Sequence, residues 1–465
     1  MPSNLSSANI MINNNANAVN RYHNTGSTNH TKLILLCVVT AIIVTIFHIQ
    51  LASFIFEDGF NFWDSGSPSY GAVARSLYEQ NMLSLDQETP TAYRPPLYPI
   101  FLAVLLQISS QPQSIIIAQS ILAGVTFGLL TAIAYSYTHR SWPTLLMLFL
   151  FVAIKFIAFD NIIQHETVLF TTLLCIGAIL FISETMVHSA KKVIGLGFVL
   201  GLAALVRPLA PVVVSVLLLW LGWLFLNRVP IVDALGKVIL CIGVFFLTLL
   251  PWGLRNWFSI GTFTLTSTTT GLNLWKGNNP ATADIYPELD IDTYRLLFNE
   301  IPEESGWWDD LRILPQLSEA EENRYLFGLG KQYILEKPVH FLKMGSVKLW
   351  ALWTPKNIPI YQGNVKWTST GAEISNLRPF YDDLLPTLIL YLLAIPGIWQ
   401  RRHSPYVFYL IAWAVAFSAI HFLTFAESRF RWPINMLMLP MAAVGLHLIV
   451  GKIGVAFKQF KISGS

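Results

Sequence analysis

Arginines and carboxylates at the ends of long apolar runs are the residues of this chain best suited to chemistry. Ionisable groups near a membrane cost free energy unless they are paired, solvated or bound to a ligand. A guanidinium binds phosphate oxygens through two parallel hydrogen bonds, and a carboxylate accepts a proton from a hydroxyl group. The residues that share this position are Asp64, Arg94, His165, Glu166, Arg207, Arg255, Glu427, Arg429 and Arg431. Each one alone is equally well explained as an interfacial charge, but together they favour a functional site.

Two of these arginines stand in short proline motifs. In YRPPLYP, at 93–99, the paired prolines hold Arg94 extended and fix how the chain re-enters the membrane. The alternative is a plain helix start with Arg94 reaching to lipid headgroups. In GLAALVRPL, at 201–209, Arg207 interrupts an apolar stretch and would bind phosphate at the junction of two short crossings. The alternative is a buried pair with a carboxylate such as Glu166.

Three further motifs add polar groups at the ends of apolar runs on the face expected outside the cytoplasm. PWGLRNW, at 251–257, contains Arg255. GLNLWKGNNP, at 271–280, offers Lys276 and Asn278 to sugar hydroxyls or phosphate, although a turn alone explains the Gly-Asn-Asn sequence equally well. ESRFRWP, at 427–433, would give a second anionic contact through its two arginines, with its glutamate orienting one of them.

The composition is that of an integral membrane protein. Of the 465 residues, 54% are hydrophobic and 12% are charged, and the mean hydropathy is +0.52. A net charge of +3 is too small to suggest nucleic acid as a partner. Residues 1–31 are polar and predict a disordered cytoplasmic tail, and run 32–56 predicts a retained signal anchor. The three cysteines lie inside apolar runs, with no spacing that suits a metal or a disulfide.

Hydropathy divides the rest of the chain into membrane runs and one large polar segment, 254–382. We expect an N-terminal membrane module at 32–253 with a first outer loop at 57–96, and C-terminal membrane helices with a short tail at 383–465. From Ala281 to Glu336 the polar segment carries thirteen acidic residues, which favours an extracytoplasmic location. The apolar runs are 32–56, 97–110, 114–137, 142–158, 163–184, 192–206, 208–226, 234–253, 383–400, 404–424 and 433–451.

The positive-inside rule places the basic loops in the cytoplasm and the candidate residues outside. Three runs then separate Arg94 from Glu166, although both are expected on the same face, so one run must fail to cross. Run 97–110 is the shortest, and we predict that it is a half-span, re-entrant or strongly tilted. The total is ten or eleven crossings. Residues 338–353 predict a helix along the membrane interface, with Gly345 as a weak point.

Motifs of nucleotide-driven and soluble enzymes are absent. The sequence has no phosphate-binding Walker loop, no dinucleotide glycine fingerprint, no HExxH and no GxSxG. A reaction carried out by this chain would therefore use an activated substrate already in the membrane.

As an ordered set, the motifs resemble the membrane glycosyltransferases of the GT-C superfamily. The set comprises an acid before a "Y…A…L" helix, RPPLYP, a glutamate after the fourth or fifth run, LxRP, PxxxRN, GN and ESRxR, over about 32–450. It is most similar to glycosyltransferase family 39, which includes protein mannosyltransferases and aminoarabinose transferases. The resemblance implies an all-α bundle in the plasma (inner) membrane. It also implies inverting transfer of a hexose or pentose from a polyprenyl-phosphate donor to a lipid, glycan or protein acceptor outside the cytoplasm.

The resemblance also implies roles for individual residues. Asp64 would be the general base on the acceptor hydroxyl, Arg207 a contact to the donor phosphate, and Glu166 would orient the acceptor or a divalent cation, with His165 beside it. No other cofactor is implied. Many relatives place the aspartate four residues before the tyrosine, where this chain has Gly66. Asp64 stands two residues further upstream, and Asp58 is the second candidate.

Two other hypotheses belong to different classes of protein. A transporter of lipids or lipid-linked sugars would spread ionisable residues through the membrane midplane and often shows paired halves, neither of which is evident here. A non-catalytic GT-C homologue would be consistent with glycine at the expected aspartate position.

Overall fold

The structure is a computed structural model, and the described residues fall in several stretches. They are 28–55, 68–109, 111, 113–143, 145, 166–183, 189–280, 282, 286, 313–355, 360–368, 371–380 and 384–463. Asp58, Asp64, His165 and most of the apolar run 142–158 lie outside them. The side chain of Arg429 also lies outside what is described. The roles predicted for these residues therefore stay predictions.

The described chain is built almost entirely of helices, as expected of an all-α polytopic membrane protein. The first part contains α2 (Thr28–Ile55), α3 (Pro68–Gln80), α4 (Leu97–Ile108), α5 (Gln113–Thr138), α8 (Thr167–Ile182), α9 (Ala190–Val206), α10 (Ala210–Leu226) and α11 (Ile231–Ile260). The second part contains α12 (Thr270–Gly277), the 3-10 turn η4 (Leu314–Gln316), α16 (Glu319–Glu336), α17 (Pro338–Trp353), α18 (Leu384–Gln400), α19 (Pro405–Leu423), the 3-10 turn η5 (Ser428–Arg431) and α20 (Trp432–Ser463).

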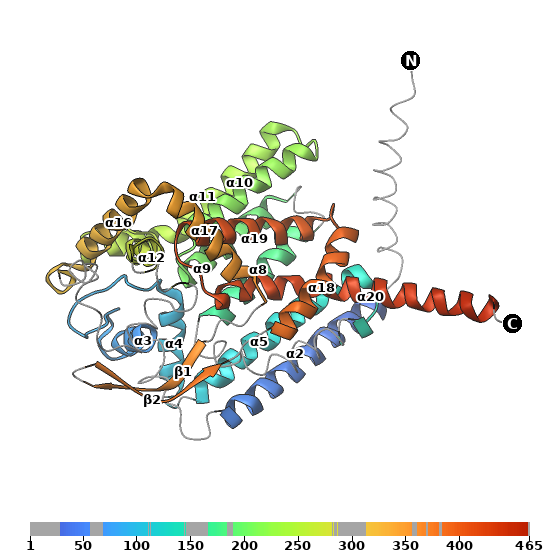
Figure 1. Cartoon of the computed structure of the whole chain (residues 1–465), viewed down its shortest axis with the longest axis horizontal. Coiled ribbons are helices and arrows are strands. Elements are labelled where there is room, and N and C mark those ends of the chain that lie inside the picture. The colour runs from blue at the N-terminus through green and yellow to red at the C-terminus, as the bar shows by residue number, and fades with distance from the viewer. Residues whose placement is uncertain are drawn as a thin grey trace, which may run out of the picture.

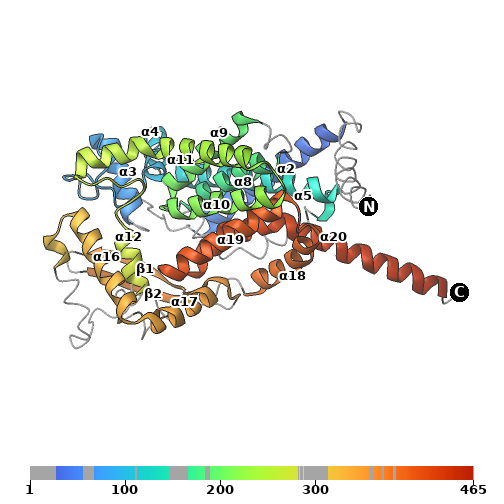
Figure 2. The ribbon, with the colours of Figure 1, turned by 90° about the horizontal axis from the view of Figure 1, so that it is seen from above.

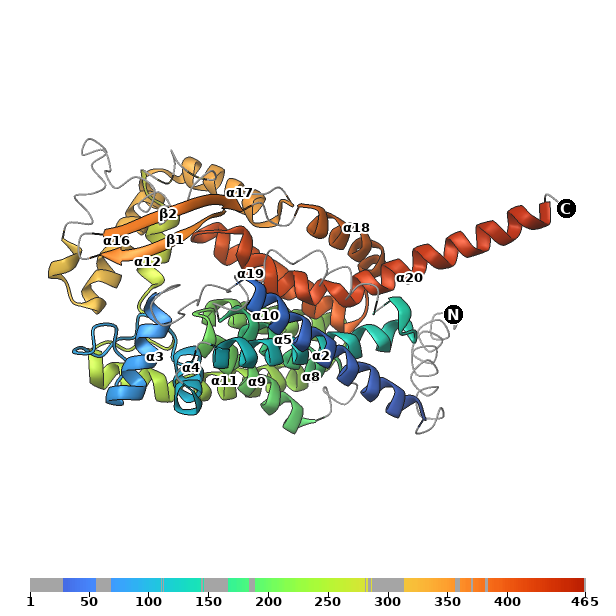
Figure 3. The ribbon, with the colours of Figure 1, turned by 90° about the horizontal axis from the view of Figure 1, so that it is seen from below.

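The helices form two layers that follow the order of the chain. Figure 1 shows α2 and α5 side by side, with α20 running past them and extending beyond the bundle. In Figure 2, α8 to α11 lie on one side, and α17, α18 and α19 lie on the other. Figure 3 shows the same separation from below and places α3, α12 and α16 at the end of the molecule opposite the C-terminus. Arg207 at the end of α9 and Phe430 between α19 and α20 are in contact where the two layers meet.

Five helices among the described residues are long and apolar enough to cross a membrane. They are at Thr31–Gln50, Gln113–Thr138, Ile231–Ile260, Pro405–Leu423 and Trp432–Ile453. Helices α4, α8, α10 and α18 are apolar but shorter. The 12 residues of α4 extend only about 18 Å at 1.5 Å per residue, well below a hydrocarbon thickness of about 30 Å. This length agrees with the predicted half-span, while the count of ten or eleven crossings stays a prediction.

Small residues let neighbouring helices approach closely, as is typical of helix packing in membranes. A Cβ added to Gly124 of α5 would overlap the hydroxyl of Thr45 in α2. Gly397 of α18 and Gly445 of α20 lie against each other, because a Cβ on either would overlap a backbone carbonyl of the other helix. These contacts fix α2 on α5 and α18 on α20.

The predicted loop region 254–382 contains its own ordered elements. Ser318 and Glu321 form a capping box that starts α16. The predicted interfacial helix 338–353 is present as α17 with the same bounds and continues through Gly345, where a Cβ would overlap the ring of Phe422. The antiparallel strands β1 (Ile360–Thr368) and β2 (Gly371–Phe380) pair from Ile360 with Phe380 to Thr368 with Gly371. The predicted domain boundaries remain predictions.

Candidate functional site

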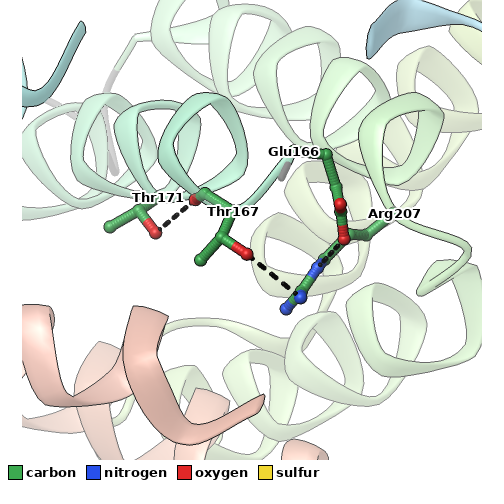
Figure 4. Close-up of polar contacts among 4 residues, drawn as sticks. All are labelled: Glu166, Thr167, Thr171 and Arg207. Carbon is green, nitrogen blue, oxygen red and sulfur yellow. Dashed lines mark hydrogen bonds and ion pairs between the residues drawn. The ribbon is translucent and has the colours of Figure 1, made fainter. Parts of the chain in front are cut away.

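A buried ion pair joins the ends of two consecutive described helices. Glu166 is the N-cap residue of α8, and Arg207 is the C-cap residue of α9. The Nε of Arg207 donates to Oε1 of Glu166 at 2.8 Å, and its Nη2 donates to the hydroxyl of Thr167 at 3.3 Å. Figure 4 shows both contacts, and each side chain of the ion pair is only 10% exposed. The structure therefore has the buried pair of Arg207 with Glu166, which the sequence analysis gave as the alternative to a phosphate contact.

Aromatic rings cover the guanidinium of Arg207. Its Cζ lies 5.6 Å from the ring centre of Phe170 and 5.7 Å from that of Phe430. Phe430 in turn stacks on His421, with the ring centres 4.8 Å apart and the planes 14° apart. Among the described residues, Nη1 of Arg207 has no hydrogen-bond partner. The guanidinium is thus fixed in orientation, and within the part of the chain that the structure describes the two N–H groups of Nη1 make no hydrogen bond.

Tyr70 connects this pair to Arg94. Tyr70 is buried on α3, and its phenol lies close enough to the carboxylate of Glu166 to feel its charge. Burial raises the pKa of that phenol, and the negative charge of Glu166 raises it further, while Arg94 and Arg207 oppose the change. The guanidinium of Arg94 lies over the ring of Tyr70 at 4.7 Å and over that of Tyr93 at 5.3 Å. Arg94, Glu166 and Arg207 therefore surround one buried tyrosine.

Two side chains, Arg255 and Glu319, form hydrogen bonds to the segment just before Arg94. Nη1 of Arg255 donates to the carbonyl of Thr91 at 2.7 Å, and its Nη2 donates to that of Leu83 at 3.3 Å. Glu319, the first residue of α16, accepts from the hydroxyl of Thr91 at 2.6 Å and from the backbone N–H of Ala92 at 2.9 Å. The contacts of Arg255 therefore position the Arg94 segment, and its predicted substrate contact stays a prediction.

The remaining predicted residues gather beside η5. Lys276 ends α12, with its Nζ 5.8 Å from the ring of Phe425. Asn278 is buried and uses its amide to donate to the carbonyls of Leu274 at 2.8 Å and Leu423 at 2.7 Å, as the turn interpretation expects. Arg431 is 1% exposed and donates to the carbonyl of Leu352 at 3.2 Å. Glu427 starts the turn, since its carbonyl accepts from the N–H of Phe430 at 3.1 Å.

Sequence reasoning missed several residues that organise this region. Tyr70 lies six residues after Asp64, and Phe430 lies between the two arginines of ESRFR, so both stand next to candidate residues in the sequence. Lys348 belongs to the segment 338–353 that is predicted to lie along the membrane interface, but its side chain is buried, with 1% exposed. Burial lowers the pKa of its ammonium to about 7. Among the described residues there is no group of three or more His, Cys, Asp or Glu side chains that would hold a metal ion.

Comparisons with known proteins identify no family for this chain. No family model matches the sequence, and no curated protein matches it. Among solved structures, the chain is similar to an archaeal oligosaccharyltransferase, AglB from Archaeoglobus fulgidus, solved in complex with an inhibitory peptide and a dolichol-phosphate. The identity is 12% and the TM-score is 0.48, over 91% of this chain and 52% of that chain. The chain therefore spans about half the length of that solved protein.

Proposed function

We propose that this chain is a membrane glycosyltransferase that moves a sugar from a polyprenyl-phosphate donor to an acceptor outside the cytoplasm. The observation that carries the proposal is the arrangement around Arg207. A guanidinium fixed by Glu166 and Thr167, covered by two aromatic rings, keeps unused donors beside Arg94 and Tyr70. Such a group stabilises the charge of a departing phosphate without reorganising, which is the main requirement of this reaction.

In the proposed reaction, an acceptor hydroxyl attacks the anomeric carbon of the donor sugar from the side opposite the phosphate. The bond between that carbon and the phosphate oxygen breaks, and the polyprenyl phosphate leaves with the electron pair. Asp64 takes the proton of the hydroxyl, and Arg207 and Arg94 bind the leaving phosphate. Asp64 stands six residues before Tyr70, a separation that an extended chain spans in at most about 20 Å, so the two roles are compatible with one site.

The ion pair also supports a role for Glu166 that is distinct from base catalysis. Its carboxylate already accepts from Nε of Arg207, and its negative charge acts on the buried phenol of Tyr70. A carboxylate in such a pair holds the orientation of the guanidinium. If it moved away, the buried guanidinium would be left without its partner, which costs free energy. We therefore assign Glu166 to positioning Arg207, in addition to the acceptor or cation contact that the resemblance implies.

The test is transfer in membranes that contain the full chain. A panel of radiolabelled undecaprenyl-phosphate hexoses and pentoses is supplied, and the label that reaches lipid, glycan or protein is measured. Native chain should transfer at least one sugar, Asp64→Asn should lose transfer, and the double variant Glu166→Gln with Arg207→Met should bind undecaprenyl phosphate poorly. The double variant is chosen because Arg207→Met alone leaves Glu166 buried without its partner.

Arg324→Met provides the matched control, because Arg324 is an exposed arginine of α16 far in sequence from the site motifs. It should keep native transfer and binding. Undiminished transfer by Asp64→Asn would remove that residue from the role of base. Movement of an intact lipid-linked sugar across the membrane, with no sugar transferred to any acceptor, would favour the transporter instead.

A further inference from the structure

Side chains from other parts of the chain form hydrogen bonds to the backbone of segment 424–431. It joins α19 to α20, includes η5, and carries Phe430 to the guanidinium of Arg207. Three consecutive backbone carbonyls of this segment accept hydrogen bonds from side chains. Lys348 donates to Thr424 at 2.8 Å, the Nδ1 of His421 lies 2.7 Å from the oxygen of Phe425, and the hydroxyl of Tyr286 donates to Ala426 at 3.0 Å.

Lys348 is the central member of this set. Its Nζ also donates to the carbonyl of Gly277 at 3.2 Å and to Oδ1 of Asn278 at 3.4 Å. Three acceptors match the three N–H donors of an ammonium group, and among the described residues no carboxylate pairs with it. A buried lysine without a carboxylate is costly, so its three oxygen contacts indicate a specific role at this junction.

The same helix holds the other end of the segment. The carbonyl of Leu352, one turn after Lys348 on α17, accepts from Nη1 of Arg431 at 3.2 Å. Helix α17 is thus attached both where the segment starts, at Thr424, and where it ends, at Arg431. A shift of α17 would move Phe430, which lies between these two attachments.

We propose that Lys348 is a positioning residue for the candidate site, and that it acts by fixing segment 424–431 so that Phe430 covers Arg207. The catalytic part of this inference rests on the proposed function, whereas the structural part does not. Loss of the lysine should free the Thr424 carbonyl, loosen the turn and uncover one face of the guanidinium. Arg207 would then sample more orientations, and its contact to a donor phosphate would weaken.

The structural part is tested by hydrogen exchange of the full chain in lipid nanodiscs. Lys348→Met keeps the length of the side chain and removes its donors. It should lower the protection of amides 424–431 by about tenfold or more, the effect of losing a hydrogen bond from a charged group. Amides of α5 and α9 should be unchanged. Lys343→Met, which alters an exposed lysine of the same helix, should behave as the native chain. Native protection of 424–431 in Lys348→Met would overturn the proposal.

Tyr286→Phe is a second, milder variant, which keeps the test informative if Lys348→Met fails to fold. It removes one hydroxyl and no charge, and it should loosen the same amides to a smaller extent, because the neighbouring carbonyl of Ala426 loses its donor. If both variants fold and neither lowers the exchange protection of amides 424–431, the hydrogen bonds to the carbonyls of Thr424, Phe425 and Ala426 do not position the segment.

The functional part is tested by a double-mutant cycle with Phe430→Leu in the transfer assay. Lys348→Met alone should raise the donor KM about tenfold while kcat changes by less than about threefold, since a looser guanidinium weakens binding of the phosphate. If Lys348 acts through Phe430, then Lys348→Met should add little to the KM of Phe430→Leu. Fully additive effects would contradict this route. If even the native chain shows no transfer, the proposed function fails and the exchange experiment still decides the role of Lys348.

Discussion

The guanidinium of Arg207, at the end of α9, faces the ring of Phe430, in the turn before α20, at 5.7 Å. These residues come from opposite layers of the molecule and from motifs far apart in the sequence. Their contact joins the N-terminal helices that carry Glu166 to the C-terminal segment that carries ESRFR. Changes on either side should therefore act on the same guanidinium.

Arg207→Lys should weaken binding of undecaprenyl phosphate about ten- to a hundredfold, as expected for losing one or more hydrogen bonds to a charged group. Lysine keeps the positive charge but lacks the planar fork that bonds Glu166 and Thr167 while offering Nη1. Binding to the purified chain in nanodiscs measures the effect. Arg324→Lys is the matched control, and equal affinities for the two variants would show that charge alone is sufficient.

Glu166→Ala should destabilise the fold by about 3–5 kcal/mol, because it leaves the guanidinium of Arg207 buried without its partner. The double variant Glu166→Gln with Arg207→Met should recover much of that loss, since no unpaired charge remains. Unfolding in mixed micelles of SDS and a mild detergent measures both. A loss below about 1 kcal/mol for Glu166→Ala would indicate that the pair is effectively solvated.

Gly277→Ala should disrupt the junction between α12 and α19. A Cβ at this position would overlap the carbonyl oxygen of Thr424, which also accepts from Lys348. We expect a loss of about 1–3 kcal/mol, typical of overpacking. Gly236→Ala in α11 is the control, since a Cβ there meets nothing within 4 Å and alanine is the better helix former. The two variants should therefore shift the unfolding midpoint in opposite directions.

Lys348 should make stability rise with pH above neutrality. Its pKa is lowered to about 7 in the folded chain, against about 10.4 for an ordinary lysine, because burial disfavours the charged form. Between these values the unfolded chain binds one more proton at this residue than the folded chain does. The free energy of unfolding then rises by up to about 1.4 kcal/mol for each pH unit across that window, and this contribution is constant below pH 7.

The comparison for this effect is Lys348→Met, which should remove the contribution and leave a flatter profile between pH 7 and pH 10. Lys343→Met should keep the native slope, because Lys343 is exposed. A native profile that falls over this range, relative to Lys348→Met, would mean that the oxygen contacts of Lys348 outweigh its burial.

The helices were largely predictable because their residues are continuously apolar. Run 208–226 corresponds to α10, Ala210–Leu226, and the interfacial segment 338–353 has the same bounds as α17. Apolar length determines where a membrane helix begins and ends, so local sequence suffices. Helix α16 and the strands β1 and β2 lie in the polar region, where hydropathy carries no such signal, and they were not predicted.

The candidate site was predictable only in part. Ionisable groups beside apolar runs are rare, so the sequence alone marks Glu166 and Arg207 as candidates and allows their pairing, which the structure has. The covering of Arg207 by Phe430 and the burial of Lys348 depend on packing between distant segments. The spacing of residues in a single sequence does not show which aromatic ring contacts which guanidinium. It also does not show which lysine of an amphipathic helix is buried.

The placement of the ion pair at two helix ends has an electrostatic consequence. Glu166 stands at the N-terminus of α8, which carries about half a positive charge, and Arg207 stands at the C-terminus of α9, which carries about half a negative charge. The two side chains cancel each other, and so do the two helix ends. The pair with its two helix ends is therefore close to electrically neutral, so a phosphate bound at Arg207, as proposed above, would be selected by the direction of hydrogen bonds more than by a net charge of the pair.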